Sequence, residues 1–247
     1  GKDVVLKFLN SKLFQKKKDI VLNVAFPVVH GTNCEDGTLQ GWLELLGIAY
    51  AGCDVMSSAI GMDKDLFKLA LLSAGLPTLP HVAFRAKQWS ANRDEIIANI
   101  EDKFGYPVIV KPANLGSSVG ISKAKNQNEL IDAIDLATSF AQKVLVEHAI
   151  SNLREINCSV LGDADDCAAS ECEEPMNYDD VLSFSDKYLS NGASKGMTSL
   201  KRRLPADISD DKKAEIQKIS TEVFKLIGAA GVVRIDYLLD GDNDKVY

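Results

Sequence analysis

Short apolar runs alternate along the chain with segments whose apolar residues recur at helical spacing. The first run, residues 20–26, ends at Pro27, which predicts a buried parallel strand. Residues 39–46 then have the apolar spacing of a helix that Gly47 ends, and residues 50–53 predict another short strand. The start of the chain is thus expected to hold two strands separated by a helix.

The middle of the chain continues this alternation. Asp63 is placed to cap a helix over residues 64–74, which Gly75 and Pro77 end. The further elements expected here are strands over 81–84, 107–111, 119–122 and 144–147, and helices over 93–104 and 128–138. This order favours an α/β fold.

The last third contains a long stretch without periodicity. A strand is predicted over residues 156–161, but residues 163–204 show neither helical nor strand spacing. Irregular segments of that length are usually functional or disordered. Asp207 or Ser209 then opens a helix that reaches residue 227, and residues 232–239 predict a final strand.

Length and charge narrow the class of protein. A chain of 247 residues with 46% hydrophobic and 26% charged residues is expected to pack into one to three compact units. Its net charge of -7 offers no general attraction to nucleic acid or to an anionic membrane, and the three lysines at 16–18 are interpreted as a solvated segment. No apolar stretch reaches the roughly 20 residues of a membrane span, and no signal peptide is recognised at the start. We therefore expect a cytoplasmic protein with no nucleic-acid or membrane partner.

Residues 111–120, K-P-A-N-L-G-S-S-V-G, join two predicted strands through small side chains. Such a loop can bring backbone N–H groups and hydroxyls onto a phosphate. It is not a Walker A sequence, because the lysine precedes the loop. Taken alone, it is equally well interpreted as a structural hairpin.

Five motifs occur together in the chain. They are His30-Gly31 followed by Glu35-Asp36-Gly37-Thr38-Leu39-Gln40-Gly41, Met62-Asp63-Lys64, Lys111 with Gly116-Ser117-Ser118-Val119-Gly120, Asp186-Lys187-Tyr188, and Arg234-Ile235-Asp236. In content and order they resemble the motifs of the D-alanine–D-alanine ligases, a family of the ATP-grasp superfamily. The resemblance implies an α/β (α+β) fold with three parts: a remnant of an N-terminal α/β domain (residues 1–60), the small ATP-grasp lobe (61–147), and the large lobe with a lid loop (148–247).

The resemblance also implies which residues bind the nucleotide. They are Lys64, Lys111, Ser118 and Lys187 at the phosphates, Glu147 to Ile150 along the adenine, and Glu155 at the ribose hydroxyls. Without the motifs, Lys64 and Lys111 would be interpreted as solvated surface charges. Likewise, Glu147 would be a solvated strand end.

The residues implied at the substrate are His30, Ser117, Tyr188 and Arg234. By resemblance, Arg234 stabilises the developing oxyanion and Asp236 binds Mg²⁺ (or Mn²⁺). Because Arg234 and Asp236 lie two apart on a strand, their side chains share a face, and a surface ion pair is the alternative. His30 is alternatively a turn histidine. Tyr188 stands where lactate-incorporating relatives tend to have histidine, which favours D-alanine as the second substrate.

The function implied is ATP-dependent joining of two D-alanines through a D-alanyl phosphate, for peptidoglycan precursors, by a homodimer. The alternatives are a ligase for D-serine or D-lactate, or a nucleotide-binding module without catalysis. The family pattern also has a glycine-rich strand-turn before the first residue here and an N-E-x-N segment after Tyr247. We therefore expect a piece of a ligase that lacks part of the metal site and can be inactive by itself.

Overall fold

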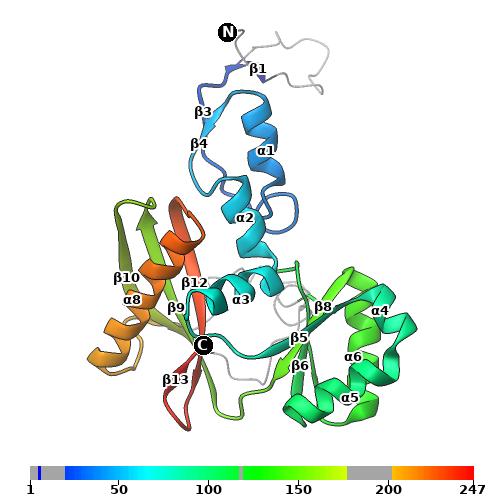
Figure 1. Cartoon of the computed structure of the whole chain (residues 1–247). Helices are drawn as coiled ribbons and strands as arrows, with labels where there is room; N and C mark the ends of the chain where they lie inside the picture. The colour runs from blue at the N-terminus through cyan, green and yellow to red at the C-terminus, as the bar shows by residue number, and fades with distance from the viewer. Residues whose placement is uncertain (1–4, 7–19, 117–118, 177–201) are drawn as a thin grey trace, which may run out of the picture.

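The computed structural model describes residues 5–6, 20–116, 119–176 and 202–247. They form an N-terminal unit and two lobes, each lobe built on its own sheet (Figure 1). None of the helices in this described part combines the length and apolar character that a membrane span needs.

The N-terminal unit is a small parallel β-α-β arrangement. Its elements are β1 (Val5–Leu6), β2 (Ile20–Val21), β3 (Val24–Ala25), α1 (Thr38–Leu45), β4 (Ala49–Tyr50) and α2 (Val55–Met62). β3 pairs in parallel with β4, as expected for the apolar run, whereas β2 pairs antiparallel with β1. Val24 is 64% exposed, so the prediction of a buried strand is wrong. α2 was not expected from the sequence; the side chain of Asp54 caps it by accepting the N–H of Ser57 at 2.8 Å.

The small lobe is a four-stranded antiparallel sheet covered by helices on one face. Its elements are β5 (His81–Arg85), α4 (Ala86–Ala91), α5 (Arg93–Phe104), β6 (Val108–Pro112), β7 (Ser122–Ala124), α6 (Gln127–Phe140) and β8 (Lys143–His148), with strand order β5-β8-β6-β7. Val108, Val110, Val144 and Val146 are buried with residues of α5 and α6. The alternate residues, Lys111 and Glu147 among them, therefore lie on the opposite face of the sheet.

The strand expected at residues 119–122 begins later, at Ser122. Gly120 has φ +69°, and a Cβ there would lie 2.9 Å from Pro112 Cγ. The chain therefore turns at Gly120, and pairing with β6 starts only after that turn.

The large lobe pairs five antiparallel strands in the order β11-β10-β9-β12-β13. Its elements are β9 (Leu153–Gly162), β10 (Cys167–Pro175), β11 (Arg202–Arg203), α8 (Asp210–Leu226), β12 (Gly231–Asp240) and β13 (Lys245–Val246). α8 covers one face, and its buried Ile216, Val223 and Phe224 pack with the strands. Ser209 caps this helix, accepting the N–H of Lys212. β10 falls in the stretch predicted to be irregular, because its residues lack apolar alternation.

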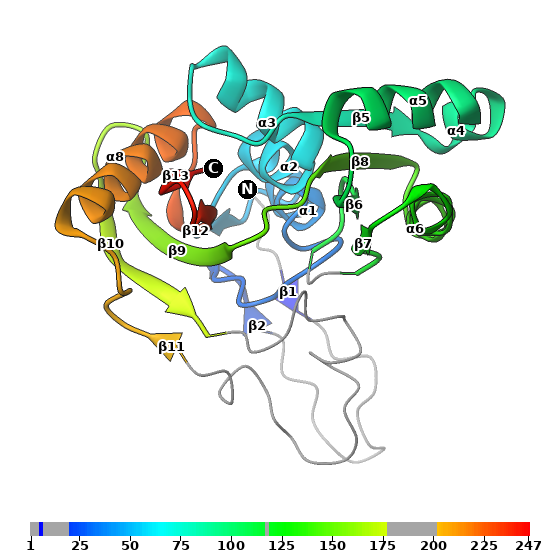
Figure 2. The same ribbon diagram turned by 90° about the horizontal axis from the view of Figure 1, so that it is seen from below.

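Helix α3 (Lys64–Ser73) lies between the two sheets (Figure 1). Its predicted cap is confirmed, since Asp63 accepts the N–H groups of Asp65 and Leu66. On one side, Leu71 belongs to the large-lobe core. On the other side, the N–H of Lys64 donates to the carbonyl of Ala113 at 2.9 Å, which joins the helix to the small lobe. Figure 2 shows α8 and α6 at opposite outer sides of the molecule, with the strands of both sheets between them.

Candidate functional site

Three lysines gather around the buried carboxylate of Glu147 on the uncovered face of the small sheet. Glu147 is only 1% exposed; Lys111 donates to its Oε1, and Lys68 Nζ lies 2.9 Å from its Oε2 as an ion pair rather than a well-aligned hydrogen bond. Burial would raise the pKa of Glu147, but Lys111 and Lys68 outweigh it and hold that pKa below its ordinary value. The alternative interpretation, a solvated strand end, is therefore wrong, because Lys68 of α3 covers the end of β8.

Lys64 is the third cation of this cluster. Its Nζ lies 2.5 Å from the carbonyl oxygen of Leu115 and 3.4 Å from that of Ala113, within the loop that follows β6. Burial, and then the neighbouring charge of Lys111, lower the pKa of Lys64 to about 8. An isolated surface lysine would show no such shift, so the alternative interpretation of Lys64 as a solvated surface charge is also wrong.

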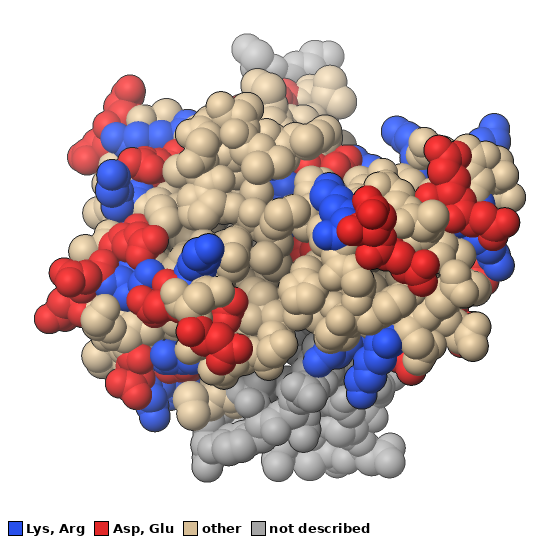
Figure 3. Space-filling model, turned by 60° about the horizontal axis from the view of Figure 1, so that its bottom comes forward, with Lys and Arg blue, Asp and Glu red and all other residues tan. Residues whose placement is uncertain are grey.

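The cluster has more positive than negative charge. Lys64, Lys68 and Lys111 face one carboxylate, in a chain whose net charge is -7. On the face shown in Figure 3, acidic and basic side chains are interspersed over both lobes, so this excess is local. A buried excess of ammonium groups next to a loop of small residues can bind a polyanion such as a polyphosphate.

A second set of ion pairs fixes the start of α3 on the small sheet. Lys143 on β8 contacts Asp63 Oδ2 at 2.7 Å and Asp65 Oδ2 at 3.0 Å, and His81 Nε2 lies 2.9 Å from Asp65 Oδ1. These contacts flank Lys64 on both sides in the sequence. They therefore set the position of its ammonium relative to Lys111.

Arg234 and Asp236 share a sheet face, as their spacing predicts, and form the surface ion pair that was the alternative interpretation. Arg234 Nε and Nη2 lie 2.6 and 3.0 Å from the two carboxylate oxygens of Asp236, while the intervening Ile235 is buried with α8. The contact with Asp236 raises the pKa of Arg234 further, and the charge of Glu35 acts in the same direction.

Glu155 shares the sheet face of Arg234 and Asp236. In the antiparallel register, Glu155 pairs with Leu238 and Asn157 pairs with Asp236, while the alternate residues of β9 are buried. Ile150 is half-buried in the connection from β8 to β9. The residues predicted for the ribose and for the metal thus lie along one surface that continues from the end of β8.

The His30 loop is shaped by the acidic residues of its own motif. His30 is 80% exposed, and its Nδ1 lies 3.7 Å from Glu35 Oε1. Glu35 also accepts the N–H of Gly31 at 2.5 Å, and Asp36 accepts the N–H groups of Asn33 and Thr38. These contacts give the motif a local structural role and hold His30 at the surface of the loop.

Four of the predicted site residues, Ser117, Ser118, Lys187 and Tyr188, lie outside the described residues. Lys68 is the reverse case: the structure places it in the cluster, but the sequence did not single it out. The available signal was its position four residues after Lys64, which puts both lysines on one face of α3.

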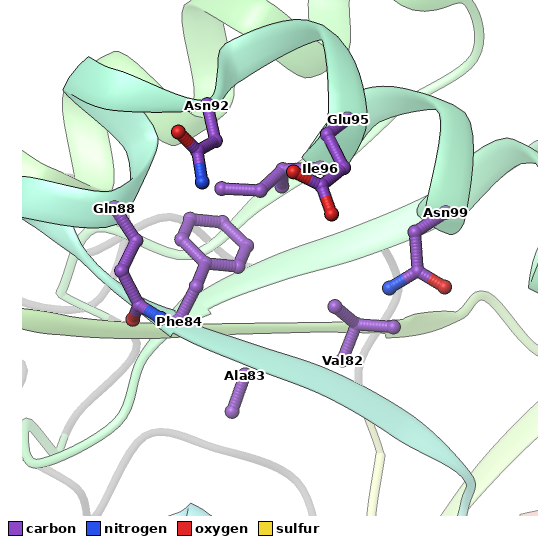
Figure 4. Close-up of a pocket in the computed structure, with 8 residues that line it drawn as sticks. All are labelled: Val82, Ala83, Phe84, Gln88, Asn92, Glu95, Ile96 and Asn99. Atoms are coloured by element: carbon purple, nitrogen blue, oxygen red, sulfur yellow. The ribbon is translucent and has the colours of Figure 1, made fainter.

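A separate groove lies on the helix-covered side of the small lobe (Figure 4). It has a volume of about 380 Å³ and is lined by β5, α4 and α5 through Val82, Ala83, Phe84, Gln88, Asn92, Glu95, Ile96 and Asn99. None of these is a predicted site residue, and none belongs to the lysine cluster.

Comparison with known protein families decides the assignment. The family model described as the C-terminus of D-ala D-ala ligase matches residues 70–247, and the model of the N-terminus matches residues 5–53. The chain belongs to the D-alanine–D-alanine ligase family. The resemblance drawn from the motifs and the α+β fold expected from it are confirmed.

Individual family members show the same relationship. The chain is 39% identical to a D-alanine–D-alanine ligase of Acetivibrio thermocellus, over 96% of this chain and 60% of that protein. It is 43% identical to one of Caldicellulosiruptor bescii, over 92% of this chain and 60% of the relative. The chain therefore spans about 60% of the length of these two relatives.

Solved structures of the family have the same fold. The D-alanine–D-alanine ligase of Coxiella burnetii superposes with a TM-score of 0.76 at 29% identity, covering 93% of this chain and 57% of that one. The VanG D-Ala:D-Ser ligase of Enterococcus faecalis superposes with a TM-score of 0.77 at 33% identity, covering 93% of this chain and 64% of that one.

Proposed function

We propose that the protein to which this chain belongs uses ATP to join two D-alanine molecules into D-alanyl-D-alanine, a precursor of peptidoglycan. The observation that carries the proposal is the partly buried excess of lysine ammonium groups around Glu147, on a chain of this ligase family. The first D-alanine carboxylate would take the γ-phosphoryl group of ATP and release ADP. The amine of the second would then attack the acyl phosphate, displace inorganic phosphate and lose a proton as the peptide bond forms.

Lys64 and Lys111 would hold the phosphates in this proposal. Both are held by contacts with the small sheet or its loops, so their charge is in place before the nucleotide arrives. Residues from Glu147 to Ile150 would line the adenine, and Glu155 would accept the ribose hydroxyls. The surface that continues from β8 to β9 supports this order.

Arg234 would bind the carboxylate and then the tetrahedral intermediate, because a guanidinium remains charged and directs several N–H donors. It would first have to release Asp236, since both carboxylate oxygens now face it. A magnesium ion that takes most of its ligands from the nucleotide fits one hard oxygen donor such as Asp236. When bound, it would offset phosphate charge. Within the described residues, no group of three His, Cys, Asp or Glu side chains is arranged to hold a metal ion.

The remaining predicted residues stay part of the proposal. His30, Ser117 and Tyr188 would contact the substrate, and Ser118 and Lys187 the nucleotide, with Lys187 and Tyr188 on a lid that excludes water. We also propose the three-part division at residues 60 and 147, a homodimer for the full-length protein, and a cytoplasmic location where ATP is available.

The decisive experiment compares this chain with the full-length protein. Dipeptide formation is measured by mass spectrometry and phosphate release by a coupled assay, with ATP, Mg²⁺ and D-alanine. We expect the full-length protein to make the dipeptide and Lys111→Met to lower kcat/KM by at least about a hundredfold, because one charge-assisted phosphate contact is lost. A full-length protein that binds ATP but makes no dipeptide would refute the ligase proposal.

A ligase that uses D-serine as the second substrate is the second candidate, favoured by the similarity to the D-Ala:D-Ser ligase structure. Competition between D-alanine, D-serine and D-lactate in one reaction separates these products by mass. An exclusive D-alanyl-D-serine or D-alanyl-D-lactate product would overturn the choice of D-alanine.

A further inference from the structure

The Lys68 ammonium lies close to three protein oxygens, two of them hydrogen-bond acceptors and the third an ion-pair partner. Its Nζ lies 2.9 Å from Glu147 Oε2, 3.2 Å from Thr78 Oγ1 and 3.1 Å from the carbonyl oxygen of Leu79. A lysine ammonium has three donors and no acceptor. Protein oxygens therefore already surround the Lys68 ammonium, in contrast to a residue whose charge is open to a nucleotide phosphate.

Lys111 differs from Lys68 in its contacts. It reaches Glu147 Oε1 from the middle of the uncovered sheet face, and the loop of small residues that follows it begins at the end of β6. Any phosphate held by Lys111 competes with Glu147 for that ammonium. When a phosphate binds Lys111, the charge of Glu147 is balanced mainly by Lys68.

We propose that Lys68 is a positioning residue that keeps Glu147 ionised and correctly oriented while Lys111 binds a nucleotide phosphate. The inference deepens the proposed function and rests on it. Because the Glu147 side chain is only 1% exposed, water cannot stabilise its negative charge. Without a second cation it would take up a proton or swing away, and the edge offered to the adenine would be lost.

The surroundings of Lys68 suit a permanent counter-ion. Its side chain is only 13% exposed, and Thr78 and Leu79 belong to the connection between α3 and β5. Burial lowers the pKa of Lys68, whereas the charge of Glu147 opposes that change. Lys68 thus connects helix α3 and the segment between α3 and β5 to the carboxylate of Glu147 at the end of β8.

The test uses the full-length ligase with Lys68→Met, Lys68→Arg and Lys87→Met. Lys87 is an exposed lysine of α4 in the same lobe and serves as the matched control. KM for ATP, kcat and the dissociation constant for ADP are measured from pH 5.5 to 8.5. We expect Lys68→Met to raise the ATP KM about tenfold or more at pH 7 and to change kcat less than about threefold, because it weakens a nucleotide contact without touching the reacting atoms.

The pH profile separates positioning from general damage. With the Lys68 charge removed, the pKa of Glu147 rises, so ADP affinity of Lys68→Met should fall further as the pH decreases from 7 to 5.5. Lys68→Arg and Lys87→Met should keep the pH profile of the parent. If Lys68→Met does not fold, Lys68→Gln removes the charge while keeping hydrogen-bond donors, and the same profile is expected.

A double-mutant cycle with Glu147→Gln completes the test. If Lys68 acts through Glu147, adding Lys68→Met to Glu147→Gln should change ADP affinity less than about twofold. Independent, additive effects of the two substitutions, or an equal loss of affinity at every pH, would overturn the inference. ADP binding is read without turnover. A protein that makes no dipeptide but shows the expected pH profile would therefore refute the ligase function and leave the role of Lys68 standing.

Discussion

Replacing Glu147 with glutamine is the most informative single perturbation of this fold. It removes the one negative charge among Lys64, Lys68 and Lys111 while keeping the shape of the side chain. Lys68 and Lys111 would then lose their carboxylate partner, and Asp63 would remain as the carboxylate acting on Lys64. We expect a large loss in the free energy of unfolding at pH 7.

The size of that loss follows from the geometry. At 2.9 Å and an effective dielectric constant of about 20, the Lys68–Glu147 pair has a Coulomb attraction of about 6 kcal/mol. Desolvation of the two ions offsets much of it, and losing one partner of a buried pair costs about 3–5 kcal/mol. Because the side chains of Lys68 and Lys111 keep 13% and 18% exposure to water, we expect the lower end, about 3 kcal/mol.

The pH dependence of the loss provides a sharper test than its size. In the variant, the lysines have a lower pKa in the folded state than the value of about 10.4 that they have in the unfolded state. At a pH between these two pKa values, the unfolded state therefore binds more protons. The penalty is fully present below the folded pKa and shrinks as the pH rises toward the unfolded value. Since the pKa of Lys64 is already about 8, the loss should be smaller at pH 9.5 than at pH 7.

Urea denaturation of the parent, Glu147→Gln and Glu95→Gln at both pH values measures this difference. Glu95 is an exposed carboxylate of the same lobe, and its replacement should cost less than about 1 kcal/mol. A cost below about 1 kcal/mol for Glu147→Gln, or a cost that grows from pH 7 to pH 9.5, would refute the account of the cluster as uncompensated positive charge.

Three further outcomes are expected. Nucleotide binding should take up a proton near pH 8, because phosphate raises the lowered pKa of Lys64; calorimetry in buffers of different ionisation enthalpy detects it, and Lys64→Met should abolish it. Gly231→Ala should lower the free energy of unfolding, measured by thermal denaturation, by about 1–3 kcal/mol, because φ is +74° and the new Cβ would lie 2.9 Å from Gly52 Cα. As a control, Gly61→Ala in α2 should be neutral or stabilising, because the new Cβ has no atom within 4 Å. The thiols of Cys158 and Cys172, 1% and 0% exposed, should react with a thiol reagent only when urea unfolds the large lobe; rapid reaction of the folded protein would contradict their burial.

Several helices, and the family, could be predicted from the sequence because their signals depend on residues that are close together in the chain. Asp63 and Ser209 cap helices through their own side chains, and Gly47 ends α1 with φ +67°. Such signals depend on a few neighbouring residues, so the positions of α3, α5 and α8 could be predicted closely. The order of the motifs identified the ligase family in the same way, because it depends on residue types and spacing alone.

Other features depended on partners far away in the sequence. β10 has no apolar alternation and exists as a strand because β9 pairs with it over most of its length. Glu147 and Lys68 are 79 residues apart in the sequence, and both look like ordinary solvated charges until α3 is placed against the small sheet.

The sequence by itself therefore determined where helices begin and end, which runs can form strands, and which family the motifs belong to. Only the tertiary structure decided which charges are buried together. That decision lies outside any local pattern, because the energy of a charge depends on the water it loses and on the ions it meets, and both are set by the packing of distant segments.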